Sequence, residues 1–212
     1  MIILFDLDGT LIDSTDAIVS TFHYACDAQG FDRVSDEEIT ALIGYPLDIM
    51  FKSVGVDDDR VWDFVTSYKE QYRKISTEKT HLLACAKEAI TLAYTFATLG
   101  IVTTKTGRYS RVLMEYFDLM KYFDVLIGRE DVEEPKPHAE PILKALQSID
   151  IEDDDVWMIG DTKLDLICAK DAGVNSIGVL CGYGKEGELK KYTDTVFDDA
   201  LQAVNFLKSR KK

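Results

Sequence analysis

The N-terminal stretch that decides the fold of this chain is IILFDLDGTL, at residues 2–11. Four apolar residues in unbroken succession are typical of a central parallel strand that is covered by helices on both faces. In open α/β sheets, ligands bind at the carboxyl ends of such strands, which is where Asp6 and Asp8 lie. Gly9 allows a sharp turn away from the sheet, with backbone N–H groups facing the carboxylates. The stretch therefore predicts a buried strand that ends at a site for a metal ion and a phosphate group.

Asp and Gly are also common turn residues, so an isolated Asp-x-Asp-Gly would fit an acidic turn equally well. The full run Asp6-Leu7-Asp8-Gly9-Thr10, directly after an apolar strand, is more specific. It resembles the signature of the haloacid dehalogenase superfamily, whose phosphatases carry D-x-D-G-T at this place. The resemblance can be tested against the rest of the chain.

Three further features of that superfamily occur later in the sequence and in the expected order. Members have a Thr or Ser that ends the second strand, a Lys before a later helix and an acidic cluster after the fourth strand. The sequence offers Thr103, Lys136 and GDTKLD at residues 160–165. The resemblance covers nearly the whole chain, and it implies an α/β fold with a doubly wound, Rossmann-like parallel sheet.

The composition is that of a globular protein with a large acidic excess. The chain has 212 residues, of which 46% are apolar, and a formal net charge of −14. This charge argues against nucleic acid or an anionic membrane as a partner, because either would need a basic face. No stretch approaches the roughly 18 apolar residues of a membrane span, and the four cysteines lack disulfide or zinc-site spacing. We expect a cytoplasmic monomer or homodimer that binds a small phosphorylated metabolite.

Residues 15–79 contain the signals of four helices and of no strand. Ser35 and Glu38 match the S-x-x-E capping box, and Pro46 can begin a further helix. The segment resembles the smaller α-helical cap of the superfamily. We therefore predict a four-helix cap of residues 15–79 inserted into a Rossmann-like core made of residues 1–14 and 80–212.

From Ala84 onward helical and apolar segments alternate, which predicts βαβ units and a parallel sheet. Strands are expected at 98–103, 123–127, 156–159 and 176–179, and helices near 84–95, 109–120 and 139–148, with a further helix that ends at Gly173.

The resemblance implies a covalent mechanism for hydrolysis of a phosphate monoester. Asp6 would be the nucleophile and would form an aspartyl-phosphate that water then cleaves. Asp8, two residues further on, would protonate the leaving oxygen and afterwards deprotonate the attacking water. Asp6 cannot move these protons itself while it is esterified.

A Mg²⁺ cofactor is implied by the same resemblance, because attack of an anion on an anion needs charge neutralisation. Its expected ligands are the Asp6 side chain, the Asp8 backbone carbonyl and the Asp161 side chain. Asp165 lies one helical turn beyond Asp161, so both carboxylates can face the same side. We assign Asp165 to orienting the metal ion or its waters.

Thr103 and Lys136 are expected to bind the phosphoryl oxygens, Lys136 also offsetting the Asp6 carboxylate. Many relatives have Asn where this chain has Thr104, and either threonine could donate the hydroxyl. The backbone N–H groups of Leu7, Asp8 and Thr104 could complete the phosphate site. In the cap, Lys52 is the residue predicted to bind a substrate carboxylate, although an ordinary solvated lysine would explain it too.

The function predicted from the sequence is a Mg²⁺-dependent phosphatase that is most similar to phosphoglycolate phosphatases. Inorganic pyrophosphatases, nucleotide or sugar-phosphate phosphatases and sugar phosphomutases of the same superfamily are the alternatives. A dehalogenase is disfavoured because Asp8 is present, and a non-enzymatic scaffold is disfavoured because no expected site residue is missing.

Overall fold

The structure is a computed structural model that describes residues 1–149 and 155–210. Its main sheet consists of β1 (Ile2–Phe5), β4 (Thr98–Val102), β5 (Val125–Ile127), β6 (Val156–Gly160), β7 (Asn175–Val179) and β8 (Val196–Phe197). The strands lie in the order β5-β4-β1-β6-β7-β8, and all neighbours are parallel. The order reverses direction around β1, as in doubly wound sheets. The predicted fold class is confirmed.

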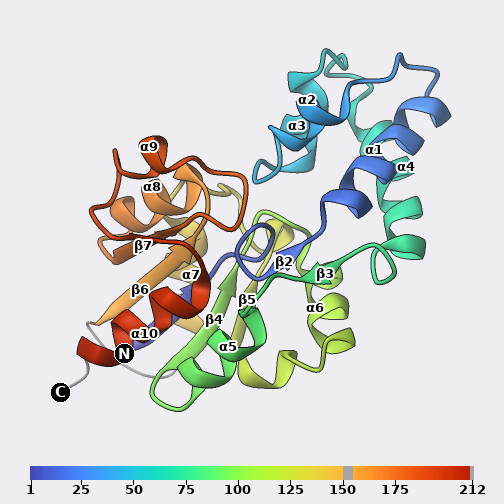
Figure 1. The fold of residues 1–212 in the computed structure, drawn as a ribbon. Helices are drawn as coiled ribbons and strands as arrows, with labels where there is room; N and C mark the ends of the chain where they lie inside the picture. The colour runs from blue at the N-terminus through green and yellow to red at the C-terminus, as the bar shows by residue number, and fades with distance from the viewer. Residues whose placement is uncertain (150–154, 211–212) are drawn as a thin grey trace.

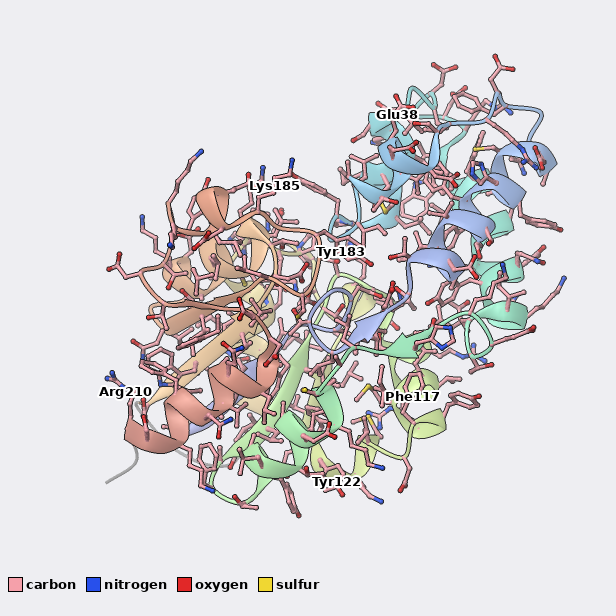
Figure 2. All side chains as sticks on the ribbon, viewed as in Figure 1. Glu38, Phe117, Tyr122, Tyr183, Lys185 and Arg210 are labelled. Atoms are coloured by element: carbon pink, nitrogen blue, oxygen red, sulfur yellow. The ribbon has the colours of Figure 1, made fainter. Side chains whose placement is uncertain are left out.

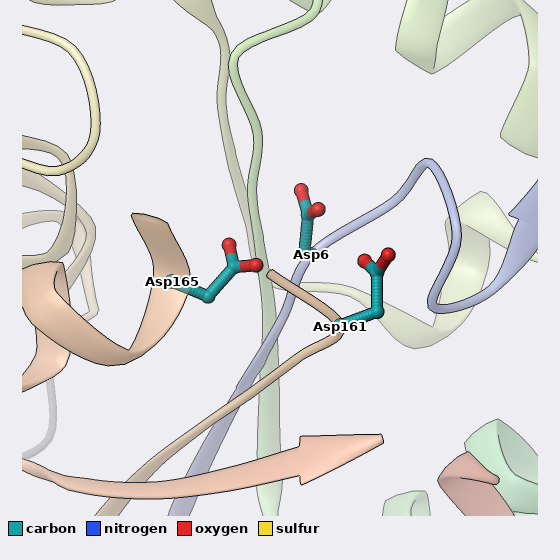
Figure 3. A group of neighbouring side chains, drawn as sticks. All are labelled: Asp6, Asp161 and Asp165. Atoms are coloured by element: carbon teal, nitrogen blue, oxygen red, sulfur yellow. The ribbon is translucent and has the colours of Figure 1, made fainter. Parts of the chain in front are cut away.

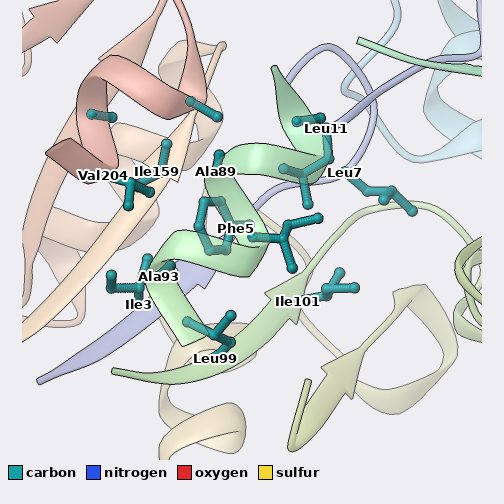
Figure 4. Packing of buried hydrophobic residues seen from close by; sticks show 14 of the residues in the cluster. Ile3, Phe5, Leu7, Leu11, Ala89, Ala93, Leu99, Ile101, Ile159 and Val204 are labelled. Carbon is teal, nitrogen blue, oxygen red and sulfur yellow. The ribbon is translucent and has the colours of Figure 1, made fainter. Parts of the chain in front are cut away.

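β1 is central, and its side chains enter two separate cores. Ile3 and Phe5 pack into the cluster that includes α5 (Ala86–Tyr94) and α10 (Ala200–Arg210) (Figure 4). Ile2 and Leu4 pack on the opposite face, where α7 (Glu140–Ser148) and α8 (Lys163–Asp171) contribute. All four side chains are buried, which explains why the strand is an unbroken apolar run.

Four helices form a unit beside the sheet: α1 (Thr15–Ala28), α2 (Asp36–Thr40), α3 (Leu47–Ser53) and α4 (Val61–Ile75). This helical unit has a hydrophobic cluster of its own, in which Phe51 stacks on Phe22 and contacts Phe64. Figure 1 shows the unit standing beyond the carboxyl ends of β1 and β4. The capping box predicted at Ser35 and Glu38 begins α2. None of the helices in the described ranges is long and apolar enough to cross a membrane.

The remaining elements include several that the sequence did not predict. A short antiparallel pair, β2 (Ile12–Asp13) with β3 (His81–Leu82), joins the helical unit to the core. Strands of two residues are too short to show a periodic pattern, so only the pairing reveals them. The other elements are α6 (Gly107–Tyr116), α9 (Glu186–Leu189) and the 3₁₀ turns η1 (Met120–Tyr122) and η2 (Arg129–Asp131).

Candidate active site

The carboxyl end of β1 places Asp6 and Asp8 in the interior of the molecule, where they are 3% and 7% exposed. The following turn needs a glycine for two reasons. Gly9 has a φ of +83°, and a Cβ atom there would lie 2.4 Å from Asp161 Oδ2. The turn thus brings the backbone of residues 8–10 against a carboxylate that follows β6.

Three carboxylates converge at this point, from Asp6, Asp161 and Asp165 (Figure 3). One oxygen of each lies within 4.8 Å of the others, and all three residues are buried. Asp165 takes its place through a capping box at the start of α8, where its Oδ2 accepts hydrogen bonds from Thr162 N (3.0 Å) and Thr162 Oγ1 (2.8 Å). The structure therefore brings together the three acids that the sequence predicted as metal-site side chains.

Asp161 is held by two segments that are distant in sequence. Its Oδ1 accepts a hydrogen bond from Thr10 Oγ1 (3.1 Å), and its Oδ2 accepts one from Tyr183 N (2.8 Å). The Tyr183 hydroxyl reaches the helical unit, where it lies 3.0 Å from Thr15 Oγ1. Figure 2 shows Tyr183 in the loop that lies between the core and the helical unit.

Lys136 is the buried cation of the acidic cluster. Its Nζ donates to Asp6 Oδ1 (2.8 Å), Asp165 Oδ1 (2.5 Å) and the Val102 carbonyl (3.0 Å). Burial by itself would lower the pKa of Lys136, but the Asp165 and Asp6 carboxylates outweigh burial and raise that pKa above its ordinary value. Lys136 is therefore charged, and it fixes one oxygen of the Asp6 carboxylate.

The charge balance and the ligand chemistry of this cluster suit a divalent cation. Within residues 1–149 and 155–210, three buried carboxylates face the single ammonium group of Lys136. Burial, with the Asp165 charge next in importance, raises the pKa of Asp6 to about 7. Burial and then the Asp6 charge raise the pKa of Asp161 as well. An unbalanced group of oxygen ligands without His or Cys favours Mg²⁺ over zinc, so the residues present fit the predicted cofactor.

The Asp8 side chain lies outside this cluster and has its own cation, Lys105. Lys105 Nζ donates to Asp8 Oδ1 (2.9 Å) and Oδ2 (3.0 Å), and Ser14 Oγ donates to Oδ1. The same ammonium lies 4.9 Å from the ring centroid of Tyr72 in α4. Burial would lower the pKa of Lys105, but Asp8 outweighs it and raises that pKa above its ordinary value.

Lys105 was missed by the sequence interpretation, although it follows Thr103 and Thr104 directly. Thr103 is buried, and its Oγ1 accepts a hydrogen bond from Lys105 N (3.2 Å). The Thr104 hydroxyl instead donates to the Gly44 carbonyl of the helical unit (2.8 Å). This difference favours Thr103 as the phosphate-binding hydroxyl. The phosphate contacts of the Leu7, Asp8 and Thr104 backbone stay predictions.

Lys52 does not lie where the sequence interpretation put it. Its ammonium pairs with Asp58 at 2.8 Å, and its side chain is 44% exposed. The preceding residues of α3, Met50 and Phe51, are the ones buried in the helical unit, so Lys52 turns outward. It does not line the cavity described next.

A cavity of about 260 Å³ separates the helical unit from the core. Asp8, Thr104 and Lys105 line it from the core. From the helical unit come mainly apolar and aromatic side chains, namely Ile18, Ile43, Tyr45, Leu47, Met50, Trp62, Val65, Tyr68 and Tyr72. The position of Asp8 at its wall connects this cavity with the carboxyl end of β1.

Comparison with known proteins agrees with this geometry. Residues 3–179 match the haloacid dehalogenase-like hydrolases. Pyrophosphatase PpaX of Anoxybacillus flavithermus is 34% identical over 184 residues, which cover 84% of this chain and 82% of that protein. The protein named "Probable phosphatase IndB" of Dickeya dadantii is 32% identical over 209 residues, which cover 96% of this chain and 91% of that protein.

A solved structure of a haloacid dehalogenase-like family hydrolase from Streptococcus pneumoniae has a TM-score of 0.87 to this fold at 26% identity, and the match covers 97% of each chain. The motifs of β1, β4 and β6, the matched residues and the shared fold all agree. This protein therefore belongs to the haloacid dehalogenase-like hydrolase family.

Proposed function

We propose that this hydrolase is a Mg²⁺-dependent phosphatase that cleaves a small phosphate monoester through an aspartyl-phosphate on Asp6. The observation that carries the proposal is the convergence of Asp6, Asp161 and Asp165 around Lys136 at the end of β1. Phosphate monoesters hydrolyse so slowly unaided that enzymes supply rate factors up to about 10²¹. A covalent intermediate divides that barrier into two smaller ones.

In the first step Asp6 attacks phosphorus and the bond from phosphorus to the leaving oxygen breaks. Asp8 gives its proton to that oxygen, and Lys105 Nζ, which lies 2.9 Å from Asp8 Oδ1, holds the Asp8 side chain at the wall of the cavity. In the second step Asp8 takes a proton from water, which attacks the aspartyl-phosphate. Inorganic phosphate leaves and the Asp6 carboxylate is restored.

Asp6, Asp161 and the Asp8 backbone carbonyl would hold the metal ion, with Asp165 orienting its surroundings. When bound, Mg²⁺ supplies neutralisation of the phosphoryl charge. Lys136 holds the Asp6 carboxylate in place and adds a second positive charge for the phosphoryl oxygens. The Thr103 hydroxyl would donate to one of those oxygens.

The helical unit would act as the cap of this active site, with residues 15–79 as one domain and residues 1–14 with 80–212 as the core. Support comes from its separate hydrophobic cluster and from the cavity that it forms with the core. The β2/β3 pair at both chain crossings is suited to be the hinge. A closing cap would exclude water and restrict the substrate to small esters.

Two substrates suggested by resemblance need separate consideration. Phosphoglycolate was favoured by the sequence, but Lys52, its expected carboxylate partner, lies outside the cavity. Inorganic pyrophosphate is the second candidate, because a relative of this chain is named a pyrophosphatase.

The reaction can be tested with purified protein and a generic aryl phosphate. Phosphate release should require Mg²⁺, stop in excess chelator and resume when Mg²⁺ is restored. Asp6→Asn should abolish release, whereas Asp32→Asn, which changes an exposed carboxylate of the helical unit, should not. Undiminished release from Asp6→Asn, or from the wild type in chelator, would refute the mechanism.

A further inference from the structure

The residues that line the cavity between α4 and the core indicate which kind of leaving group the substrate has. We propose that its substrates are phosphate monoesters of an uncharged alcohol that bears a planar ring, as in a nucleoside 5′-monophosphate, in preference to pyrophosphate or phosphoglycolate. This inference rests on the proposed function, because it assumes that Asp6 attacks phosphorus and that Asp8 protonates the leaving oxygen.

The position of Asp8 determines where the leaving group lies. Asp6 belongs to the acidic cluster with Lys136, whereas the Asp8 carboxylate lines the cavity together with Lys105. A general acid must lie within hydrogen-bond distance of the oxygen that it protonates. The group attached to that oxygen therefore extends from Asp8 into the cavity.

Aromatic side chains from both the helical unit and the core line the cavity. Helix α4 lines it with Trp62, Val65 and Tyr72, which recur at helical spacing and so share one face. Tyr109 of α6 lines the core side, and its ring centroid lies 5.9 Å from that of Tyr72. Tyr72 is also stacked on Tyr68, with centroids 5.5 Å apart. Tyr72 is buried and already contacts Tyr68 and Lys105, so the more exposed Trp62 and Tyr109 are the side chains that can stack on a planar group.

The charges of the cavity do not favour a second anion. Its lining contains three acidic side chains, Asp8, Asp48 and Glu130, and three basic ones, Lys69, Lys105 and Arg129. The formal charge of the lining therefore sums to zero. The phosphate that leaves from pyrophosphate, or the carboxylate of glycolate, would need cations that are free to bind it, because burying an unpaired charge is costly.

One of the three cations already has an acidic partner, because Lys105 donates to both oxygens of Asp8. Arg129 donates one hydrogen bond to the neutral Val132 carbonyl (3.0 Å) and keeps its charge. Among the described residues, Lys69 has no acidic partner, and it is half-buried in the α4 face. The charges of Lys69 and Arg129 are matched in number by those of Asp48 and Glu130 in the same lining, so the cavity has no net positive charge for an anion. Both basic side chains can donate hydrogen bonds to a neutral oxygen.

The volume of the cavity limits the size of that organic group. At about 260 Å³, it falls just below the roughly 300–1,000 Å³ that is usual for sites of drug-sized ligands. Such a space can hold one ring system with its sugar, which suits a free metabolite.

The test compares kcat/KM for uridine 5′-monophosphate, phenyl phosphate, phosphoglycolate and pyrophosphate, all with saturating Mg²⁺. The two ring-bearing esters should exceed phosphoglycolate and pyrophosphate by at least about tenfold, in line with the strength of aromatic stacking. A higher value for the uridine ester would identify a nucleoside as the natural leaving group, and a higher value for phenyl phosphate would identify a smaller aryl alcohol.

Tyr109→Ala should then lower the preference for ring-bearing esters over phosphoglycolate by about tenfold, and Tyr109→Phe should retain it because the ring remains. Tyr94→Ala is the matched control. Tyr94 is a 54% exposed aromatic of α5 that packs on Tyr122, away from the cavity, and its loss should change no ratio.

Preference of the wild type for pyrophosphate or phosphoglycolate would overturn this inference and leave the proposed function intact. An equal loss on all four compounds in Tyr109→Ala, with an unchanged unfolding midpoint, would also overturn it. Absence of phosphate release from every compound would overturn the proposed function and this inference with it.

Discussion

Lys105 and Asp8 form a buried ion pair. Removing one of the two charges should therefore lower the stability of the protein more than removing both. Lys105→Met deletes the ammonium while keeping an unbranched side chain of similar length. The Asp8 side chain, which is only 10% exposed, would lose its cationic partner and keep the hydrogen bond from Ser14. The cation–π contact with Tyr72 would be lost as well.

The size of the effect follows from the geometry. Two unit charges 2.9 Å apart attract by about 6 kcal/mol at an effective dielectric constant of roughly 20. Desolvation of both groups offsets part of this attraction, and removal of one partner from a buried pair costs about 3–5 kcal/mol. Because Asp8 retains Ser14 and faces a cavity, we expect the lower end, about 3 kcal/mol.

Equilibrium unfolding in urea can measure this cost in two backgrounds. In the wild type, Lys105→Met should lower the free energy of unfolding by about 3 kcal/mol. In Asp8→Asn the buried ammonium has already lost its counter-charge, so the same substitution should be neutral or stabilising. An equal loss in both backgrounds would refute the reasoning, because the cost would then come from packing and from Tyr72 alone.

Three further predictions concern the metal site and the helical unit. Mg²⁺ at 100 times its dissociation constant should stabilise the protein by about 2.7 kcal/mol, which can be measured as a higher midpoint of thermal unfolding. Asp161→Asn should remove that shift. A wild-type midpoint that does not respond to Mg²⁺ would contradict the proposed metal site. Gly182→Ala should abolish Mg²⁺-dependent turnover in a steady-state assay, because its Cβ would lie 2.1 Å from Asp161 Oδ2; normal kinetics would show that this approach is unimportant. Lys52→Ala should change kcat/KM by less than about twofold on every substrate, since an exposed pair contributes little; a loss confined to phosphoglycolate would restore Lys52 as a carboxylate ligand.

The elements that sequence predicts well here are those whose signals are local. The strand at residues 2–5 is an unbroken apolar run because both faces of β1 are covered. The helix expected after Ser35 begins where its capping box requires. Asp161 and Asp165 do come together as predicted, although the reason differs: Asp161 precedes the N-cap Thr162, and the capping box at the start of α8 positions Asp165. In each case the residues that decide the structure lie within a few positions of one another.

The features that sequence missed depend on contacts between distant segments. Lys105 and Asp8 are 97 positions apart, so nothing near Lys105 indicates its partner. β2 and β3 become strands only because Ile12 meets Leu82. The outward position of Lys52 has a related cause. A helix of seven residues with apolar neighbours on several sides does not reveal which side faces the core until α4 packs against it.

This difference explains why the chemistry of the protein is more predictable than its substrate. The carboxylates that we propose to react follow β1 and β6, and a parallel sheet with β1 at its centre brings these strand ends together. The cavity is formed largely by α4 and its neighbours, and its charge depends on which cations are engaged elsewhere, such as Lys105 by Asp8. If the cavity binds the leaving group as we propose, substitutions on the cavity face of α4 should change the preferred leaving group while the carboxylates at β1 and β6 stay in place. The substrate therefore has to be inferred from the residues that line the cavity, because the family motif contributes no residue to the helical wall of that cavity.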